Sequence, residues 1–158
     1  MNPPNQEKPV QVASSDEGYR LKFSPRIAPQ PSRLAFKPGE ERIWSVVGMD
    51  LSGLTVPQLV LRYDPMALDI AGASVGTAFL VDPQTPPMVK IDPAMGTIRV
   101  MSTDGNPLRF QNGGEVLSLR VRGGLSGDTM LVMDPPVFSS AGGERVDVAV
   151  AGGAARVE

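Results

Sequence analysis

The stretch L-V-L-R-Y-D-P at residues 59–65 decides the fold class of this chain. Leu59, Leu61 and Tyr63 recur with a period of two, which places their side chains on one face of a β-strand. The Asp-Pro pair that follows should end the strand, because the Asp side chain accepts hydrogen bonds from amides two residues on while the Pro ring fixes φ. The stretch therefore predicts a strand that buries one face and ends at a turn.

The same alternation recurs on both sides of this stretch. Apolar residues alternate in T-I-R-V-M-S at 97–102 and in E-V-L-S-L-R-V-R at 115–122, with arginines on the opposite parity at positions 62, 99, 120 and 122. Strands that bury only one face are typical of antiparallel sheets packed in pairs. The prediction is an all-β chain folded as an antiparallel two-sheet sandwich.

Gly, Pro, Asp and Asn clusters separate the remaining short apolar runs, and 16 Pro with 17 Gly would interrupt any long helix. Pro38-Gly39 suits a tight turn, and Gly152-Gly153 offers residues that tolerate positive φ. Weaker strand signals lie at 19–23 and 79–81. The main strands are expected at 33–36, 41–49, 57–63, 68–73, 88–91, 97–102, 115–122, 129–133, 145–150 and 154–157.

Composition sets the limits on function. The 158 residues with 41% apolar content suffice for one core, and the formal charge of −2 favours neither nucleic acid nor an anionic membrane surface. The chain has no His and no Cys, which excludes Ser-His-Asp and Cys-His catalysis, His-rich zinc sites and disulfides. No apolar run is long enough to span a membrane, and the N-terminus lacks a signal-peptide pattern. We expect a binding protein and no enzyme.

The chain divides into two parts. Residues 1–24 contain Pro, Gln and Ser and are expected to be a flexible linker, and residues 25–158 are expected to be the sandwich domain. A linker of this kind fits a module excised from a larger protein.

Four segments in order resemble the cohesin domains, the scaffoldin modules that bind dockerins. F-K-P-G-E at 36–40 is similar to the family's opening strand and Pro-Gly-acidic turn, and 59–68 resembles its L-x-Y-D-P-x-x-L motif. I-D with G-T-I at 91–98 resembles the I-D-x-x-x-G-x-I hairpin, followed by G-E-V-L-S-L-R-V at 114–121. The resemblance covers residue 33 to the end.

The resemblance implies a jelly-roll sandwich of about nine strands, related in architecture to carbohydrate-binding modules. It also implies a non-catalytic protein-interaction module of a larger secreted or cell-envelope bacterial protein. Cohesin-like modules occur on secretin-type proteins of type II secretion, so the implied partner is a dockerin-like protein or a secretion-machinery component. Gln58 departs from the pattern, since dockerin-binding cohesins commonly have an acidic residue there.

The resemblance further implies that one sheet docks the partner on its outer face. Parity places apolar and cationic side chains together there, which suits an acidic, partly apolar segment, because Arg binds carboxylates well. The expected partner-binding residues are Gln58, Val60, Arg62, Lys90, Arg99, Met101 and Arg120.

Two alternatives stay open, a carbohydrate-binding module and a structural spacer. Trp44 and Tyr63 could stack on sugar rings, but a lone Trp in an alternating strand is more often part of a core. Asp104-Gly105-Asn106 is better interpreted as a turn than as a metal loop. We therefore expect no cofactor, no metal and no nucleic acid, and polysaccharide is the less favoured partner.

Overall fold

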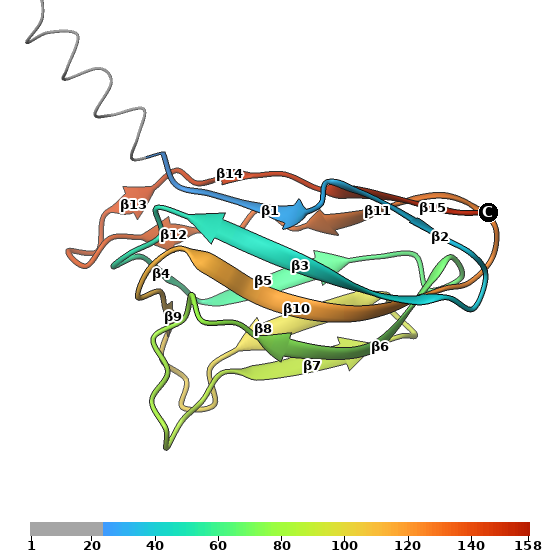
Figure 1. Cartoon of the computed structure of the whole chain (residues 1–158). Helices are drawn as coiled ribbons and strands as arrows, with labels where there is room; N and C mark the ends of the chain where they lie inside the picture. Colours follow the sequence, from blue (N-terminus) through green and yellow to red (C-terminus); the bar gives the residue numbers. More distant parts are fainter. Residues whose placement is uncertain (1–23) are drawn as a thin grey trace, which may run out of the picture.

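β-Strands are the only regular elements in residues 24–158, the part of the chain that the computed structural model describes (Figure 1). Five of the fifteen strands have only two residues, and these short strands explain most of the difference from the roughly nine strands that the resemblance implies. The expected linker at 1–24 and the weak strand signal at 19–23 lie outside the described residues, apart from Ser24. The all-β prediction is confirmed.

Three sheets contain all the strands. The first holds β1 (Arg26–Gln30), β3 (Glu41–Met49), β6 (Leu68–Val75), β10 (Gly114–Gly123) and β14 (Ala149–Val150), in the order β14-β1-β3-β10-β6. The second holds β2 (Arg33–Phe36), β5 (Gln58–Arg62), β7 (Met88–Asp92), β8 (Thr97–Met101), β11 (Gly127–Met133) and β15 (Gly153–Val157), in the order β2-β15-β11-β5-β8-β7. A small third sheet holds β4 (Thr55–Val56), β9 (Leu108–Arg109), β12 (Phe138–Ser139) and β13 (Arg145–Val146).

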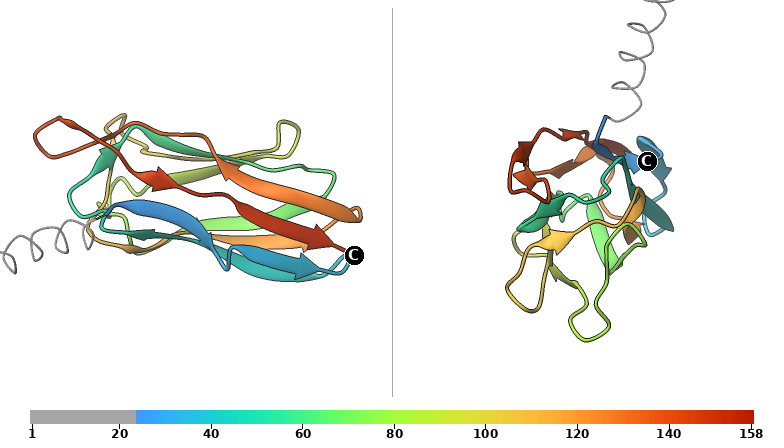
Figure 2. Two further views of the ribbon diagram at one scale, coloured as in Figure 1. Left: turned by 90° about the horizontal axis from the view of Figure 1, so that it is seen from above. Right: turned by 90° about the vertical axis from the view of Figure 1, so that its left-hand side faces the viewer.

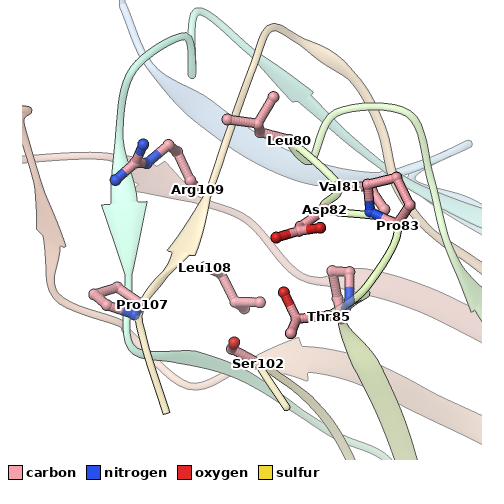
Figure 3. A pocket seen from close by; sticks show the side chains of 10 residues that line it. Leu80, Val81, Asp82, Pro83, Thr85, Ser102, Pro107, Leu108 and Arg109 are labelled. Carbon is pink, nitrogen blue, oxygen red and sulfur yellow. The ribbon is translucent and has the colours of Figure 1, made fainter. Parts of the chain in front are cut away.

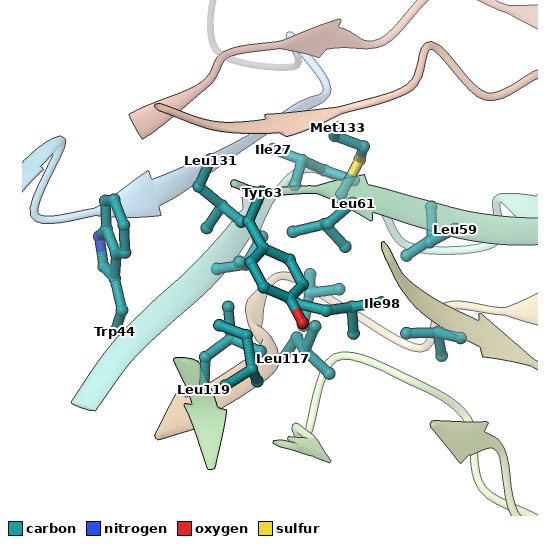
Figure 4. Close-up of a cluster of buried hydrophobic side chains, with 14 of the residues drawn as sticks. Ile27, Trp44, Leu59, Leu61, Tyr63, Ile98, Leu117, Leu119, Leu131 and Met133 are labelled. Carbon is teal, nitrogen blue, oxygen red and sulfur yellow. The ribbon is translucent and has the colours of Figure 1, made fainter. Parts of the chain in front are cut away.

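The first and second sheets pack face to face over one core (Figures 1 and 2). Leu59 and Leu61 of β5 point inward, directly opposite Val100 and Ile98 of β8, as the period of two predicts. Alternate residues of β10 supply the facing layer, so Figure 4 shows Leu117 and Leu119 across the core from β5. The side chains of this core belong to both sheets, which makes the domain one folding unit.

Trp44 of β3 is completely buried at one side of this core (Figure 4). Its ring nitrogen donates a hydrogen bond to the carbonyl of Pro31 at 2.7 Å, so the one polar group of the ring is satisfied. Gly153 of β15 lies against the ring, because a Cβ there would be 2.5 Å from Trp44 Cζ2. The prediction of positive φ at Gly152-Gly153 is wrong: neither residue adopts it, and Gly153 instead makes room for the indole.

Two predicted turns are confirmed. After β5, the amide of Met66 donates to Asp64 Oδ1 at 2.9 Å and the amide of Leu68 donates to the Asp64 carbonyl at 2.9 Å. At the Pro38-Gly39 turn, Gly39 has a φ of 82° and the amide of Glu40 donates to the Lys37 carbonyl at 3.0 Å. Both turns use the residue that their geometry requires.

The alternation of apolar residues did not predict β1, because Pro25, Pro29 and Pro31 flank or interrupt this strand. Pro29 is tolerated inside this strand because β14 pairs only with Arg26 and Ile27 of β1. One side of Pro29 therefore has no ladder partner in the described residues. The expected strand at 145–150 is divided into β13 and β14, which belong to different sheets.

The described chain enters at one end of the sandwich and ends at the other. The first strand, β1, begins near the small third sheet, and the C-terminus lies at the far end, beyond β15 (Figures 1 and 2). Most strand pairs are antiparallel, but two are parallel: β1 with β14, and β2 with β15, where Arg33 is opposite Ala154 and Phe36 is opposite Val157.

Candidate functional site

The outer surface of β11, β5, β8 and β7 carries side chains in three rows, which we call the docking face. Opposite residues in an antiparallel sheet point to the same side, so the strand register defines the rows. They are Gln58-Met101-Met88, Val60-Arg99-Lys90 and Val132-Arg62-Thr97-Asp92, with Met130 of β11 beside the last row.

Six of the seven residues predicted to bind a partner lie on this face. Gln58, Val60 and Arg62 follow one another on β5, and Lys90, Arg99 and Met101 complete the same rows on β7 and β8. Val60 is only 8% exposed but does not belong to the core cluster, since it lies beneath the surrounding side chains of the outer face. The structure brings these six together; whether they bind a partner stays a prediction.

Arg120 does not share this face, so its inclusion with the other residues is wrong. It belongs to β10 of the first sheet, opposite Ile43 of β3. There it lies 3.6 Å from Glu41 Oε2 and donates to the carbonyl of Ala71 at 3.1 Å. The period of two correctly predicted that Arg120 points to solvent, but parity carries no information about which sheet contains β10.

The docking face exposes more apolar side chains than the sequence predicted. Met88, Met130 and Val132 are 43%, 49% and 44% exposed and were not among the predicted residues. Met88 could have been found, because it has the same parity as Lys90 in the predicted strand 88–91. Met130 and Val132 could not, since the sequence does not show that β11 pairs with β5.

Arg62 is neutralised within the domain. Its Nε donates to Oδ1 and Oδ2 of Asp134 at 2.8 and 2.9 Å, and the hydrogen bond and charge of Asp134 raise the pKa of Arg62. Asp134 follows β11 directly, and its amide donates to the carbonyl of Val60 at 2.9 Å, which fixes the carboxylate beside β5. Arg62 is therefore less available for a partner's carboxylate than the sequence suggested.

Lys90 and Arg99 are directly opposite each other on β7 and β8. Neither has an acidic group within 4.0 Å among residues 24–158, whereas Arg156 at the other end of the same sheet lies 3.8 Å from Asp128. The centre of the docking face thus carries two adjacent positive charges with no ion-pair partner within 4.0 Å among residues 24–158, and Asp92 lies on the same face two residues along β7 from Lys90.

A hollow of about 390 Å³ lies between the loops at 80–87 and 102–107, beyond the Met88-Met101 row (Figure 3). The hydroxyl of Thr85 and the carboxylate of Asp82 point into it, and Leu108 lines it from β9. An inward carboxylate disfavours an anionic ligand, so the chemistry of this hollow differs from that of the docking face.

The loop at 102–107 is ordered by Asp104, as the turn interpretation requires. Asp104 Oδ1 accepts hydrogen bonds from the Ser102 hydroxyl and from the amide of Asn106 at 2.9 Å, and Gly105 has a φ of 81°. The Ser102 bond, followed by the Asn106 bond, lowers the pKa of Asp104 from 3.8 to about 2.

We predict that Ser102→Ala raises the pKa of Asp104 toward 3.8, because the hydroxyl stabilises the carboxylate form. Since the folded-state pKa is depressed, this hydrogen bond stabilises the loop above pH 3.8 and its contribution is lost as the pH falls through about 2. An NMR titration of the side-chain carboxyl carbon measures this pKa. An unchanged midpoint in the variant would contradict the assigned cause.

Aromatic side chains offer no platform for sugars on the described part of the chain. Phe36, Trp44, Phe79, Phe110 and Phe138 are at most 1% exposed, and Tyr63 is 7% exposed, with its pKa raised first by burial and then by the charges of Asp69 and Asp92. The interpretation of Trp44 and Tyr63 as core residues is confirmed.

Within residues 24–158, no three His, Cys, Asp or Glu side chains come together in a way that could hold a metal ion. The same residues contain no helix with the length and apolar character needed to cross a membrane.

The two main sheets, with their strand order and face-to-face packing, define a jelly-roll β-sandwich. No protein-family model and no curated protein sequence matches the chain. Among solved structures, a cohesin in a type I cohesin–dockerin complex from Clostridium thermocellum superposes with a TM-score of 0.70 at 15% identity, covering 86% of this chain and 94% of that one.

Two further neighbours agree. A non-cellulosomal cohesin from Archaeoglobus fulgidus has a TM-score of 0.64 at 16% identity and covers 85% of this chain and 91% of that one. The sixth cohesin of scaffoldin B from Acetivibrio cellulolyticus, solved with a dockerin, has a TM-score of 0.66 at 14% identity and covers 85% and 99%. The particular sandwich is therefore the cohesin fold, as the motifs predicted.

Proposed function

We propose that this domain is a non-catalytic protein-docking module and that the docking face is its binding surface. The observation that carries the proposal is the apolar surface on the outer side of one sheet, where Met88 is 43% exposed opposite Met101 at one end of the face, and Val132 and Met130 are 44% and 49% exposed at the diagonally opposite corner. Exposed apolar side chains that gather on one surface mark protein interaction sites. Met adapts its shape to a partner more readily than branched residues do.

The fold supports the same surface. The solved neighbours include cohesins in complex with dockerins, and the resemblance of the L-x-Y-D-P motif assigns partner docking to the sheet that contains β5. Gln58 lies in the first row of this face, where it can donate and accept hydrogen bonds but carries no charge. A partner of this domain therefore does not need the positively charged or hydrogen-bond-donating groups that would bind an acidic residue at position 58.

The cellular setting follows from the resemblance. We propose that the module belongs to a larger secreted or cell-envelope bacterial protein and serves a secretion pathway, as the cohesin-like modules of secretin-type proteins do. The Pro-containing segment at 1–24 supports attachment to another domain. Neighbouring genes for secretion machinery would favour this setting, and neighbouring genes for dockerin-bearing enzymes would favour a cellulosome.

Site-specific crosslinking tests the docking proposal. We expect a photo-reactive amino acid at Gln58 or Met88, in the full 158-residue chain, to crosslink one and the same protein from the envelope and secreted fractions of the source organism. Both positions are exposed and lie in one row of the docking face. Mass spectrometry of the crosslinked species measures the result.

The matched controls are Ile43 and Gln30, exposed positions on the strands of the first sheet. The proposal is wrong if the same protein crosslinks only from the control positions, or if none crosslinks from the docking face. Retention of the chain on cellulose or chitin would instead support a carbohydrate-binding module, which the buried aromatic residues at 24–158 disfavour.

A further inference from the structure

Lys90 and Arg99 are like charges on directly opposite residues of β7 and β8. Like charges on directly opposite residues of neighbouring strands repel each other and destabilise the sheet. Arg62 and Arg156 of the same sheet both have carboxylate partners, from Asp134 and Asp128. The central pair has none within 4.0 Å among residues 24–158.

The pair has both apolar and acidic neighbours on the docking face. Val60 lies beside Arg99 in the same row and is 8% exposed, Asp92 lies two residues from Lys90 on β7, and Asp134, which is paired with Arg62, follows Val60 in the row. Arg99 lies on β8, between β5 and β7, and is partly covered. A carboxylate that docked here would lose water but gain two charge-assisted hydrogen bonds, which are stronger than neutral ones.

Apolar side chains lie one row away from these charges. Met88 and Met101 are opposite each other, and each lies two residues along its strand from Lys90 or Arg99. Two strand residues span roughly 6.5–7 Å. A partner that fills both rows must place an apolar side chain and a carboxylate at about this separation, which corresponds to positions i and i+2 of a strand or to one turn of a helix.

We propose that the docking face binds an acidic-apolar segment of a partner protein, with Lys90 and Arg99 holding an Asp or Glu carboxylate and Met88 and Met101 holding the apolar side chain next to it. This inference rests on the proposed function and names the chemistry of its partner. A bound carboxylate relieves the repulsion between Lys90 and Arg99. The free energy by which this repulsion destabilises the unbound domain is therefore recovered on binding and increases the affinity.

Peptide selection tests the chemistry without a known partner. The probes are two phage-displayed random peptide libraries with equal apolar content, one enriched in Asp and Glu and the other in Lys and Arg, selected against the full chain. We expect binders from the acidic library, with a large apolar residue two to four positions from the acid. Calorimetry with the selected synthetic peptide should show that Lys90→Glu weakens binding by about tenfold or more.

A second measurement separates binding from folding. Lys90→Glu replaces a repulsive cross-strand pair with an attractive one, so the urea midpoint of the free domain should rise while peptide affinity falls. Arg109→Glu is the matched control, because Arg109 is exposed on β9, outside the docking face, and should leave peptide affinity unchanged.

The outcomes distinguish the two proposals. Binders that come from the basic library but map by NMR to the docking face would overturn the acidic-apolar partner and leave the docking function intact. Binders that map to the first sheet would overturn both. A Lys90→Glu variant that binds the acidic peptide as tightly as the parent would also overturn the role of the pair.

Discussion

Trp44→Ala is expected to lower the free energy of unfolding by about 3–5 kcal/mol, the usual cost of removing a large buried aromatic side chain. Trp44 is 0% exposed, and the backbone of Gly153 lies directly against its ring. Gly153 has no side chain that could move into the space, and Pro29 is held within β1, so the cavity cannot collapse well. Urea unfolding followed by far-UV circular dichroism measures the change, since the variant contains no Trp.

Trp44→Phe is the matched control. The phenyl ring retains most of the apolar contacts but cannot donate the hydrogen bond to the Pro31 carbonyl, so we expect a loss of about 1–3 kcal/mol. If Trp44→Ala cost less than Trp44→Phe, the packing of Gly153 against the indole would not be the main source of the stability that Trp44 provides.

Gly96→Ala is expected to cost about 3 kcal/mol or more, because two penalties add at this position. Gly96 has a φ of 66°, a conformation that costs an L-residue about 1–2 kcal/mol. A Cβ there would also overlap the carbonyl oxygen of Tyr63 and lie 3.1 Å from Pro65 Cδ. The amide of Tyr63 donates to the Gly96 carbonyl at 2.9 Å, so the two loops cannot separate without losing that bond.

Gly105→Ala isolates the first penalty. Gly105 has a φ of 81°, but a Cβ there would meet no atom within 4 Å, so only the backbone cost of about 1–2 kcal/mol should remain. Urea unfolding of both variants under the same conditions measures the difference. Equal losses would show that the contact between Gly96 and Tyr63 contributes nothing.

Much of the fold could be predicted because its signals are local. The period of two at Leu59, Leu61 and Tyr63 identified the buried side of β5, and the Asp-Pro pair identified the end of that strand, where the Asp64 side chain accepts the Met66 amide. Turn chemistry depends on the residues that form the turn and on few others, so it can be inferred without knowing the rest of the chain.

The remainder depends on long-range pairing. Every half-buried strand shows the same alternation, so the sequence could not show that β10 joins β3 and β6 whereas β8 joins β5 and β7. Arg120 was misplaced for that reason. The Arg62-Asp134 pair was missed for the same reason, because its two residues are 72 positions apart and meet only through the pairing of β11 with β5.

Two parallel pairs, β1 with β14 and β2 with β15, join the first strands of the described chain to its last ones and affect how the domain bears tension. The described chain enters at one end of the sandwich and ends at the other, so pulling on both ends would slide Arg33–Phe36 and Gly153–Val157 past each other along their length. Hydrogen bonds across this pair would then be sheared together instead of opening one at a time. This geometry therefore resists extension of the domain along the long axis of the sandwich.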